Sequence, residues 1–280
     1  MVPSFSMIDD AARRVELSRN LGLPVLKPPP RCQKHVDSPG SCSTIWIYDD
    51  GATVLKTSLA FYLDGCDSRQ KKEHEDLEQE SAALLEREKR IYRHLGRHPG
   101  ILHCIDISDA GLKFPYMKNG SLRSFLCNAN VQIPPSVQLS WIKTALVTFD
   151  FIHSKGVIQS DVSARNFLVT DDKSIVLCDF AGSMIGDEEN LVRPETRYEK
   201  QCERPVKVSL PTELFAIGSL IYEIITGKPP YSELEDNDVE RLFRRGEFPS
   251  TSDIYLGYVI RRCWKGEFET AREVLNAVNS

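Results

Sequence analysis

The sequence has no paired cysteines. Its eight cysteines are scattered, and no two of them stand in a C-x-x-C arrangement. Their spacing therefore suggests neither a zinc site nor a disulfide framework. Reduced thiols are the normal state of cysteine in reducing compartments, so we expect a cytoplasmic protein, with the nucleus as the alternative location.

Long apolar runs are missing as well. No stretch comes near the roughly 20 apolar residues of a membrane-spanning helix. The opening residues MVPSFSMIDD have neither the basic nor the apolar region of a secretory signal, and Val2 excludes N-myristoylation. We therefore expect neither a signal peptide nor a membrane partner.

A basic excess is the third absence. The formal net charge is −5, so the chain has no overall positive field that would attract nucleic acid. With 41% hydrophobic and 27% charged residues, the composition is that of a globular protein. A length of 280 residues suits one two-lobed domain or two small ones.

What the sequence does contain is an acidic motif between Val157 and Gly182. Two short β-prone runs, FLV and IVLC, are joined by the turn-like string DDKS, which predicts a hairpin. The hairpin would bring Asn166, at its entry, beside Asp179, at its exit. A carboxylate and an amide oxygen together suit Mg²⁺, which usually keeps a polyphosphate as a further ligand. Asp161 would then accept a hydrogen bond from an attacking hydroxyl.

This motif resembles the catalytic loop and metal-binding segment of the eukaryotic protein kinases. The family's H-R-D is Gln-Ser-Asp at residues 159–161, and its D-F-G is Asp-Phe-Ala at residues 179–181. The string DVSARN is closer to the tyrosine-kinase form of the loop. Ser163 stands where serine/threonine kinases carry a lysine, and Arg165 would supply the positive charge instead.

The resemblance assigns roles to these residues. It implies Asp161 and Arg165 as catalytic residues and Asn166 and Asp179 as ligands of Mg²⁺. Because Ser160 replaces the arginine of H-R-D, the loop is of the non-RD kind and lacks the usual docking point for a phosphorylated activation loop. We therefore predict an activity that does not depend on loop phosphorylation.

Upstream, a β-hairpin is predicted around Asp49-Asp50-Gly51, between the runs STIWIY and ATVLKT. The preceding string SPGSCSTI resembles the kinase glycine-rich loop, of which only Gly40 survives. The hairpin ends in VLK, which resembles the kinase V-A-I-K strand. The resemblance implies that Gly40 and Lys56 bind the ATP phosphates, whereas a lysine on a solvated strand edge is the plainer interpretation of Lys56.

The next segment, residues 70–95, has the apolar spacing of an amphipathic helix with a wide polar face. It resembles the kinase αC helix, which makes Glu88 the expected partner of Lys56. A preceding insertion, residues 59–70, has no predicted role.

Two strands are predicted at residues 101–107 and 111–117. The string FPYMKNGSL resembles the hinge between kinase lobes, with Phe114 as the gatekeeper and the backbone of Tyr116 or Met117 as the adenine-binding element. A β-to-helix connector without a ligand is the alternative interpretation.

The C-terminal part is mainly helical. Residues 137–155 predict a buried helix that ends at Gly156. Residues 213–227 predict a helix that is apolar nearly all round, and it resembles the kinase αF helix. The polar span between Asp179 and that helix holds no A-P-E string and would be the activation segment. A C-W pair near the end of the chain also fits the family.

The resemblance covers residues 32–278. It implies an α+β, two-lobed protein-kinase-like fold, with a small β-rich N-lobe containing one main helix (32–117) and a larger, mainly helical C-lobe (118–280). Residues 1–31 would form an arm or linker, with a short helix and a solvated or loosely docked course. The string CDFAGS is similar to that of divergent small fungal kinases.

Three functions remain open at this point. The first is a protein kinase that uses ATP and Mg²⁺ and transfers the γ-phosphate to a protein hydroxyl, with serine or threonine as the default acceptor. The second is a pseudokinase that binds nucleotide or acts as a scaffold, because Gln159, Ser160 and Ala181 depart from the family motifs. The third is a small-molecule kinase, which the αF-like helix and the C-W pair argue against.

Overall fold

The computed structural model describes residues 14, 16, 18–36, 42–128, 132–201 and 208–280. The chain divides into two compact units. The N-terminal unit comprises residues 1–92 and 103–116, and the C-terminal unit comprises residues 93–102 and 117–280. Within the described residues, no helix combines the length and the apolar character that crossing a membrane requires.

The N-terminal unit contains a five-stranded antiparallel sheet in the order β2-β3-β4-β7-β6. Its strands are β2 (Cys32–Val36), β3 (Thr44–Tyr48), β4 (Thr53–Thr57), β6 (Asp106–Ser108) and β7 (Gly111–Pro115). The hairpin predicted around Gly51 is confirmed as β3 and β4. Gly51 adopts a left-handed φ of 64°, and Asp50 Oδ1 accepts the backbone N–H groups of Ala52 and Thr53, which closes the turn.

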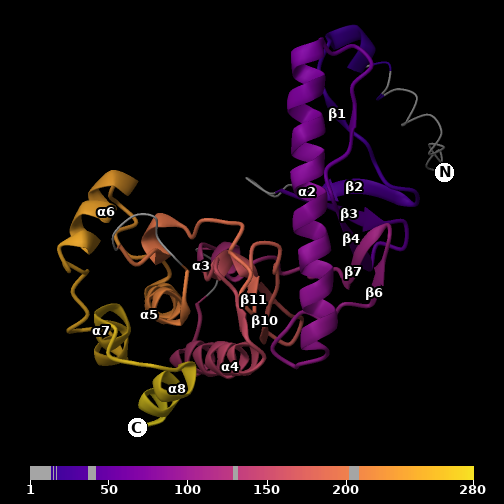
Figure 1. Ribbon diagram of the computed structural model, residues 1–280. Helices are drawn as coiled ribbons and strands as arrows, with labels where there is room; N and C mark the ends of the chain where they lie inside the picture. The colour runs from indigo at the N-terminus through magenta and orange to yellow at the C-terminus, as the bar shows by residue number, and fades with distance from the viewer. Residues whose placement is uncertain (1–13, 15, 17, 37–41, 129–131, 202–207) are drawn as a thin grey trace. The chain divides into compact units, whose positions relative to one another are not determined.

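One long helix, α2 (Ser68–Leu95), lies beside this sheet (Figure 1). Its buried side chains include Leu84, Leu85 and Ile91, which recur at the spacing of one helix face. The predicted helix over residues 70–95 is therefore confirmed, with two further residues at its start.

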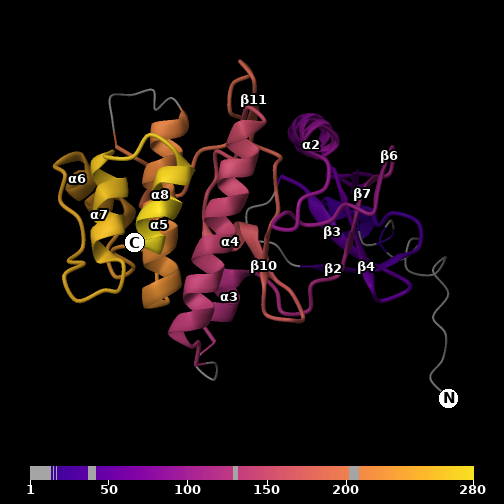
Figure 2. The ribbon, with the colours of Figure 1, turned by 90° about the horizontal axis from the view of Figure 1, so that it is seen from below.

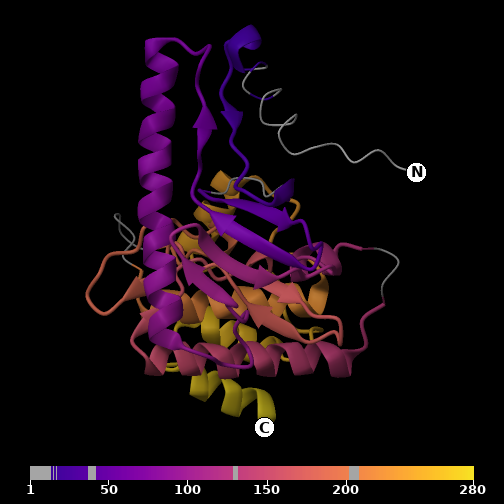
Figure 3. The ribbon, with the colours of Figure 1, turned by 90° about the vertical axis from the view of Figure 1, so that its right-hand side faces the viewer.

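Part of the arm predicted for residues 1–31 is paired with the insertion before α2. Strand β1 (Val25–Leu26) pairs antiparallel with β5 (Phe61–Tyr62), which lies in the insertion before α2. The two strands run beside the N-terminal part of α2 (Figure 3). Ser18 is fully buried, and its hydroxyl donates to the Tyr62 carbonyl over 3.0 Å. The arm and the insertion thus pack against each other. The sequence of either segment alone gives no signal of this contact.

A second difference concerns the strand predicted over residues 101–107. The strand β6 occupies only its end, whereas Ile101 and Leu102 belong to the other unit. There Leu102 N–H donates to the Leu177 carbonyl over 2.8 Å, and Leu177 N–H donates to the Gly100 carbonyl over 2.8 Å. The apolar run is therefore shared between two units, and a single strand was the wrong prediction.

The C-terminal unit is built on helices (Figure 2). They are α3 (Leu122–Leu126), α4 (Pro135–Ser154), α5 (Leu210–Thr226), α6 (Asp236–Arg244), α7 (Gly257–Lys265) and α8 (Ala271–Asn279). Helix α5 packs against α4 and α7, and α8 packs against α4 and α7. The predicted helices over 137–155 and 213–227 are thus confirmed. Helix α5 starts at a capping box of Ser209 and Thr212 and ends at Gly227, whose φ is 78°.

Two short hairpin-like ladders complete this unit. The predicted hairpin is confirmed as β9 (Phe167–Val169) paired antiparallel with β10 (Ile175–Leu177). Strand β8 (Val157–Ile158) pairs with β11 (Met184–Ile185). Three of these strands, β8, β9 and β10, lie within the acidic motif, and β11 follows it directly.

Candidate active site

The N-terminal unit contributes a buried ion pair. Lys56 lies on β4 and Glu88 on α2, and Lys56 Nζ is 2.6 Å from Glu88 Oε2. The two side chains are only 6% and 1% exposed. Lys56 is thus not a solvated edge residue, and the predicted pairing of the two side chains is observed. Two charges removed from water need each other, so this pair fixes the direction of the lysine.

The backbone hydrogen bonds of the hinge residues reduce the candidates for binding adenine. Phe114 on β7 is buried, and its ring lies 5.3 Å from that of Tyr92. Tyr116 N–H already donates to the Ala52 carbonyl over 2.8 Å. The Met117 carbonyl accepts from Gly120 N–H over 3.0 Å, which directs the adenine prediction to Met117 N–H. Gly40 lies outside the described residues.

The C-terminal unit holds the catalytic loop. Asn166 Nδ2 donates to the Asp161 carbonyl over 2.6 Å and to Asp161 Oδ2 over 2.9 Å. Burial raises the pKa of the Asp161 carboxyl to about 6, and the charges of Asp179 and Glu195 act in the same direction. The Asn166 hydrogen bond and the Arg165 charge oppose the rise in this pKa. A carboxylate with a pKa near neutrality is suited to accept a proton.

Asp179 follows directly on the β9–β10 hairpin, beside Asn166. Cys178 N–H donates to the Asn166 carbonyl over 2.8 Å, which brings the entry and the exit of the hairpin together as predicted. Because Asn166 turns its amide N–H groups toward Asp161, its Oδ1 faces away from that residue. Asn166 Oδ1 and the Asp179 carboxylate are hard oxygen donors of the kind that Mg²⁺ binds.

These two side chains are too few to hold a metal ion alone. Among the described residues, no group of three or more His, Cys, Asp and Glu side chains is placed to bind a metal. The donor set therefore fits a Mg²⁺ ion whose other ligands come from a polyphosphate and water.

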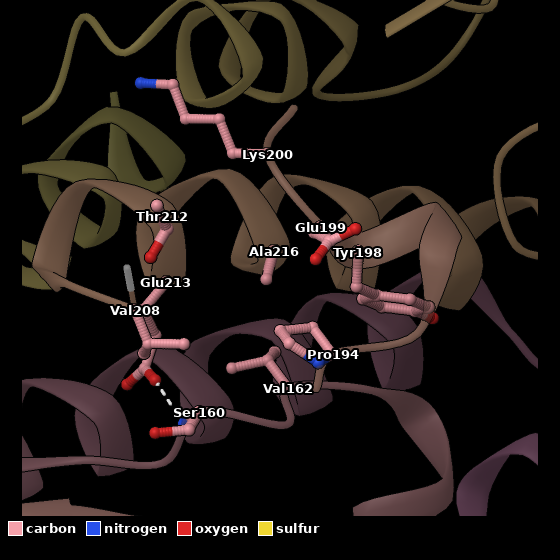
Figure 4. A pocket seen from close by; sticks show the side chains of 10 residues that line it. All are labelled: Ser160, Val162, Pro194, Tyr198, Glu199, Lys200, Val208, Thr212, Glu213 and Ala216. Atoms are coloured by element: carbon pink, nitrogen blue, oxygen red, sulfur yellow. Dashed lines mark hydrogen bonds between the residues drawn. The ribbon is translucent and has the colours of Figure 1, made fainter. Parts of the chain in front are cut away.

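A buried carboxylate holds the backbone of the catalytic loop. Glu213, on α5, accepts from His153 Nε2 over 2.7 Å, from Ser160 N–H over 2.8 Å and from Gln159 N–H over 3.1 Å. Figure 4 shows the bond between Ser160 and Glu213. The αF-like helix therefore supports the backbone of the catalytic loop through this one carboxylate.

Gln159 bridges the two acidic residues, which the sequence analysis missed. Its Nε2 donates to the Asp179 carbonyl over 3.1 Å, and its Oε1 accepts from Asp161 N–H over 2.7 Å. The side chain is 1% exposed. The departure from H-R-D at this position, which pointed to a pseudokinase, thus supplies both a donor and an acceptor.

The departure at Ala181 is also tolerated. Among the described residues near this site, left-handed backbone occurs at Ser160, with a φ of 71°, and at Asp179, with a φ of 62°, and not at Ala181. Gly182 is the residue that cannot carry a side chain, because its Cβ would lie 2.0 Å from Val192 Cγ2. Alanine is therefore not strained at 181, and one argument for a pseudokinase is removed.

Ion pairs fix the described first part of the predicted activation segment, residues 180–201, to the rest of the unit. Glu195 Oε2 accepts from Arg123 Nη1 over 2.7 Å, and Glu195 Oε1 lies 2.8 Å from Arg165 Nε. Arg123 also binds both carboxylate oxygens of Glu223 on α5, over 2.7 and 3.1 Å, and the Tyr198 hydroxyl donates to Glu223. Arg165 lies closer to Glu195 than to Asp161, whose Oδ2 is 3.9 Å from Arg165 Nη2.

A second set of ion pairs joins the activation segment to α6. Arg193 binds both carboxylate oxygens of Glu199, over 3.0 and 2.7 Å, and Glu240 on α6 over 2.9 Å. Arg197 pairs with Asp236 at the start of α6. Sequence analysis missed these partners because they are far apart in the chain.

The segment closes over the catalytic loop beside Ser160. A cavity of about 10 Å³, which is roughly the room one water needs, lies there. Its lining includes Ser160 and Val162 of the loop and Pro194 and Tyr198 of the activation segment (Figure 4).

A small unit built on an antiparallel sheet with a buried Lys–Glu pair, and a larger helical unit with the D-x-x-x-x-N and D-F motifs, together define a protein kinase. Residues 69–279 match the model of the family described as protein tyrosine and serine/threonine kinase. The chain belongs to this family. Its fold is accordingly α+β, with a small β-sheet N-lobe and a larger helical C-lobe.

Individual relatives are more distant. The chain is 25% identical to tyrosine-protein kinase Abl of Drosophila melanogaster over 60% of its length, 33% identical to platelet-derived growth factor receptor beta of Mus musculus over 43%, and 23% identical to serine/threonine-protein kinase kin-29 of Caenorhabditis briggsae over 59%. The match covers 11%, 12% and 21% of these relatives, respectively. The chain thus matches only a small part of each relative.

Proposed function

We propose that this chain is an active protein kinase that uses ATP and Mg²⁺ and transfers the γ-phosphate to a protein hydroxyl. The observation that carries the proposal is the Asp161 carboxylate, which Asn166 holds over 2.9 Å and which burial gives a pKa of about 6. Phosphoryl transfer depends mainly on positioning and on charge stabilisation, and this chain has a side chain for each task.

Each residue has one role in the proposed reaction. Lys56, directed by Glu88, binds the α- and β-phosphates. Asn166 and Asp179 hold Mg²⁺, which offsets negative charge on the phosphates. Asp161 orients the acceptor hydroxyl and takes its proton, and Arg165 supplies the positive charge that serine/threonine kinases take from a lysine.

The acceptor and the setting of the protein are part of the proposal. The relatives include kinases named for tyrosine and for serine or threonine, and we propose serine or threonine as the acceptor. We also propose Met117 N–H as the adenine donor and Gly40 as part of the phosphate loop. A cytoplasmic or nuclear location and a relation to small fungal kinases stay predictions.

The test compares Asp179→Asn with a matched control, Asp171→Asn, in the exposed turn between β9 and β10. The thermal shift caused by Mg²⁺ and ATP and the phosphoryl transfer to a generic protein substrate are measured side by side. We expect Asp179→Asn to lose both signals and Asp171→Asn to keep both. A wild-type protein that shows the Mg²⁺-dependent shift but no transfer would instead be a nucleotide-binding scaffold, and transfer to a sugar or other small molecule would contradict a protein acceptor.

A further inference from the structure

Glu195 contacts both Arg165 of the catalytic loop and Arg123 of α3. Its side chain is 23% exposed, and those of Arg123 and Arg165 are 20% and 46% exposed. Charges run in alternation from Asp161 through Arg165, Glu195 and Arg123 to Glu223. Glu195, the one carboxylate inside this series, is thus shared between two arginines.

The far end of the series is rigid. Glu223 is 1% exposed and lies on α5, the helix at the centre of the unit. Arg123 binds it through two parallel N–H···O bonds, a geometry that fixes the guanidinium plane. Arg123 therefore fixes Glu195 through its Oε2 atom, and Glu195 Oε1 lies next to Arg165.

The near end of the series is where chemistry is proposed. Arg165 Nη2 lies 3.9 Å from Asp161 Oδ2, while Arg165 Nε lies 2.8 Å from Glu195 Oε1. Without Glu195, Asp161 would be the nearest carboxylate to the Arg165 charge. A close pair would add a charged donor at Asp161 Oδ2, which already accepts from Asn166 Nδ2 over 2.9 Å, and it would weaken the carboxylate as a proton acceptor.

We propose that Glu195 is a positioning residue for the transfer reaction. It keeps Arg165 from pairing tightly with Asp161. Its carboxylate, which is part of the sequence and needs no modification, also connects the activation segment to the catalytic loop. Phosphorylation orders such segments by adding a negative group that arginines bind. Here Glu195 supplies that group permanently. This inference rests on the proposed function and adds its regulation.

The test is a double-mutant cycle in steady-state transfer from ATP, with Glu195→Gln, Arg165→Met and the double variant in the full chain. Misplacement of a catalytic group costs on the order of 100-fold in rate, so we expect Glu195→Gln to lower kcat by about 10- to 100-fold. KM for ATP should stay within about twofold of wild type, because only the transfer step is affected.

The double variant separates positioning from stability. If Glu195 acts through Arg165, the double variant has the kcat of Arg165→Met alone, because no arginine is left to misplace. Losses that multiply in the double variant overturn the inference while leaving the proposed function intact. A wild-type protein without transfer activity overturns the proposed function, and this inference with it.

A matched control lies in the same segment. Glu199 is 2% exposed and pairs with Arg193, which is 54% exposed, so Glu199→Gln also breaks an ion pair of the activation segment. Its effect on kcat should multiply with that of Arg165→Met. If Glu195→Gln fails to fold by thermal melting, Glu195→Asp replaces it in the same cycle, because the shorter side chain keeps the charge but cannot reach both arginines.

Discussion

The two units use ion pairs in different ways. In the N-terminal unit, Lys56 and Glu88 form one pair whose side chains are almost completely enclosed. In the C-terminal unit, Glu195 shares its carboxylate between two arginines, and Arg165 remains 46% exposed. The first arrangement removes two charges from water, whereas the second leaves them in partial contact with it.

This difference predicts which substitutions lower the stability of the fold and which lower only the activity. A buried pair is seldom more stabilising than apolar side chains of the same volume, but a buried charge without its partner is strongly destabilising. A partly exposed series is screened by water and contributes less to folding. We therefore expect substitutions of Lys56 to affect stability and activity together, and substitutions of Glu195 to affect mainly activity.

The largest effect is expected from Lys56→Met. It leaves Glu88 buried without its lysine, which costs about 3–5 kcal/mol in the free energy of unfolding. The double variant Lys56→Met/Glu88→Leu should recover most of that stability in urea unfolding, while transfer from ATP stays absent from both variants. Recovery of activity in the double variant would contradict the role of Lys56.

The next effect concerns Gln159, which connects the two acidic residues. Gln159→Leu removes the partner of Asp161 N–H and one hydrogen bond to the Asp179 carbonyl, and an unpaired buried group costs about 1–3 kcal/mol. Urea unfolding should show a loss in this range, and transfer activity should fall about tenfold or more. A variant as active as wild type would show that the bridge is not needed.

A smaller effect, of opposite sign, is expected from Asp161→Asn without nucleotide. Because the folded state raises the pKa of Asp161 from 3.8 to about 6, ionisation of this carboxyl opposes folding. The protonated carboxyl contributes to the free energy of unfolding, and this contribution is complete below about pH 4 and is lost as the pH rises through 6. At pH 7 the variant should unfold with a free energy about 1–3 kcal/mol higher than wild type.

The pH dependence is the control for that prediction. At pH 4 to 5 the wild-type carboxyl is mainly protonated in the folded state, so the two proteins should be closer in urea unfolding than at pH 7. An equal difference at both values would mean that the gain does not come from the charge of Asp161.

The smallest effects are expected from the loss of an exposed ion pair and from the removal of phosphate groups. Arg69→Ala removes an exposed pair with Glu73, and its cost should be about 0.5 kcal/mol or less. Phosphatase treatment should leave transfer activity unchanged, because Glu195 is already charged. Activity that disappears after phosphatase treatment would contradict the proposal that Glu195 orders the activation segment without phosphorylation.

The sequence predicted the elements whose signals are local. The turn at Gly51, the apolar spacing along α2 and the apolar run of α5 each lie within one segment, and periodicity and turn residues are properties of one segment. The spacing of Asp161, Asn166 and Asp179 likewise lies within one hairpin, so their association was predictable.

What it did not predict depends on contacts between distant segments. The pairing of β1 with β5 involves strands of two residues, which are too short to show a pattern. Glu195 and Arg123 are 72 positions apart, and neither has a distinctive neighbourhood. Gln159 was interpreted as a loss because its type differs from the family motif, whereas its function depends on where its donor and acceptor point.

The most direct test of this account is phosphoryl transfer by Asp161→Asn in the presence of Mg²⁺ and ATP. The account predicts that the variant keeps the Mg²⁺- and ATP-dependent thermal shift, because the proposed ligands Asn166 and Asp179 are unchanged, and that its transfer rate falls by at least about 100-fold. Transfer at the wild-type rate would contradict the assignment of Asp161 as the residue that accepts the proton.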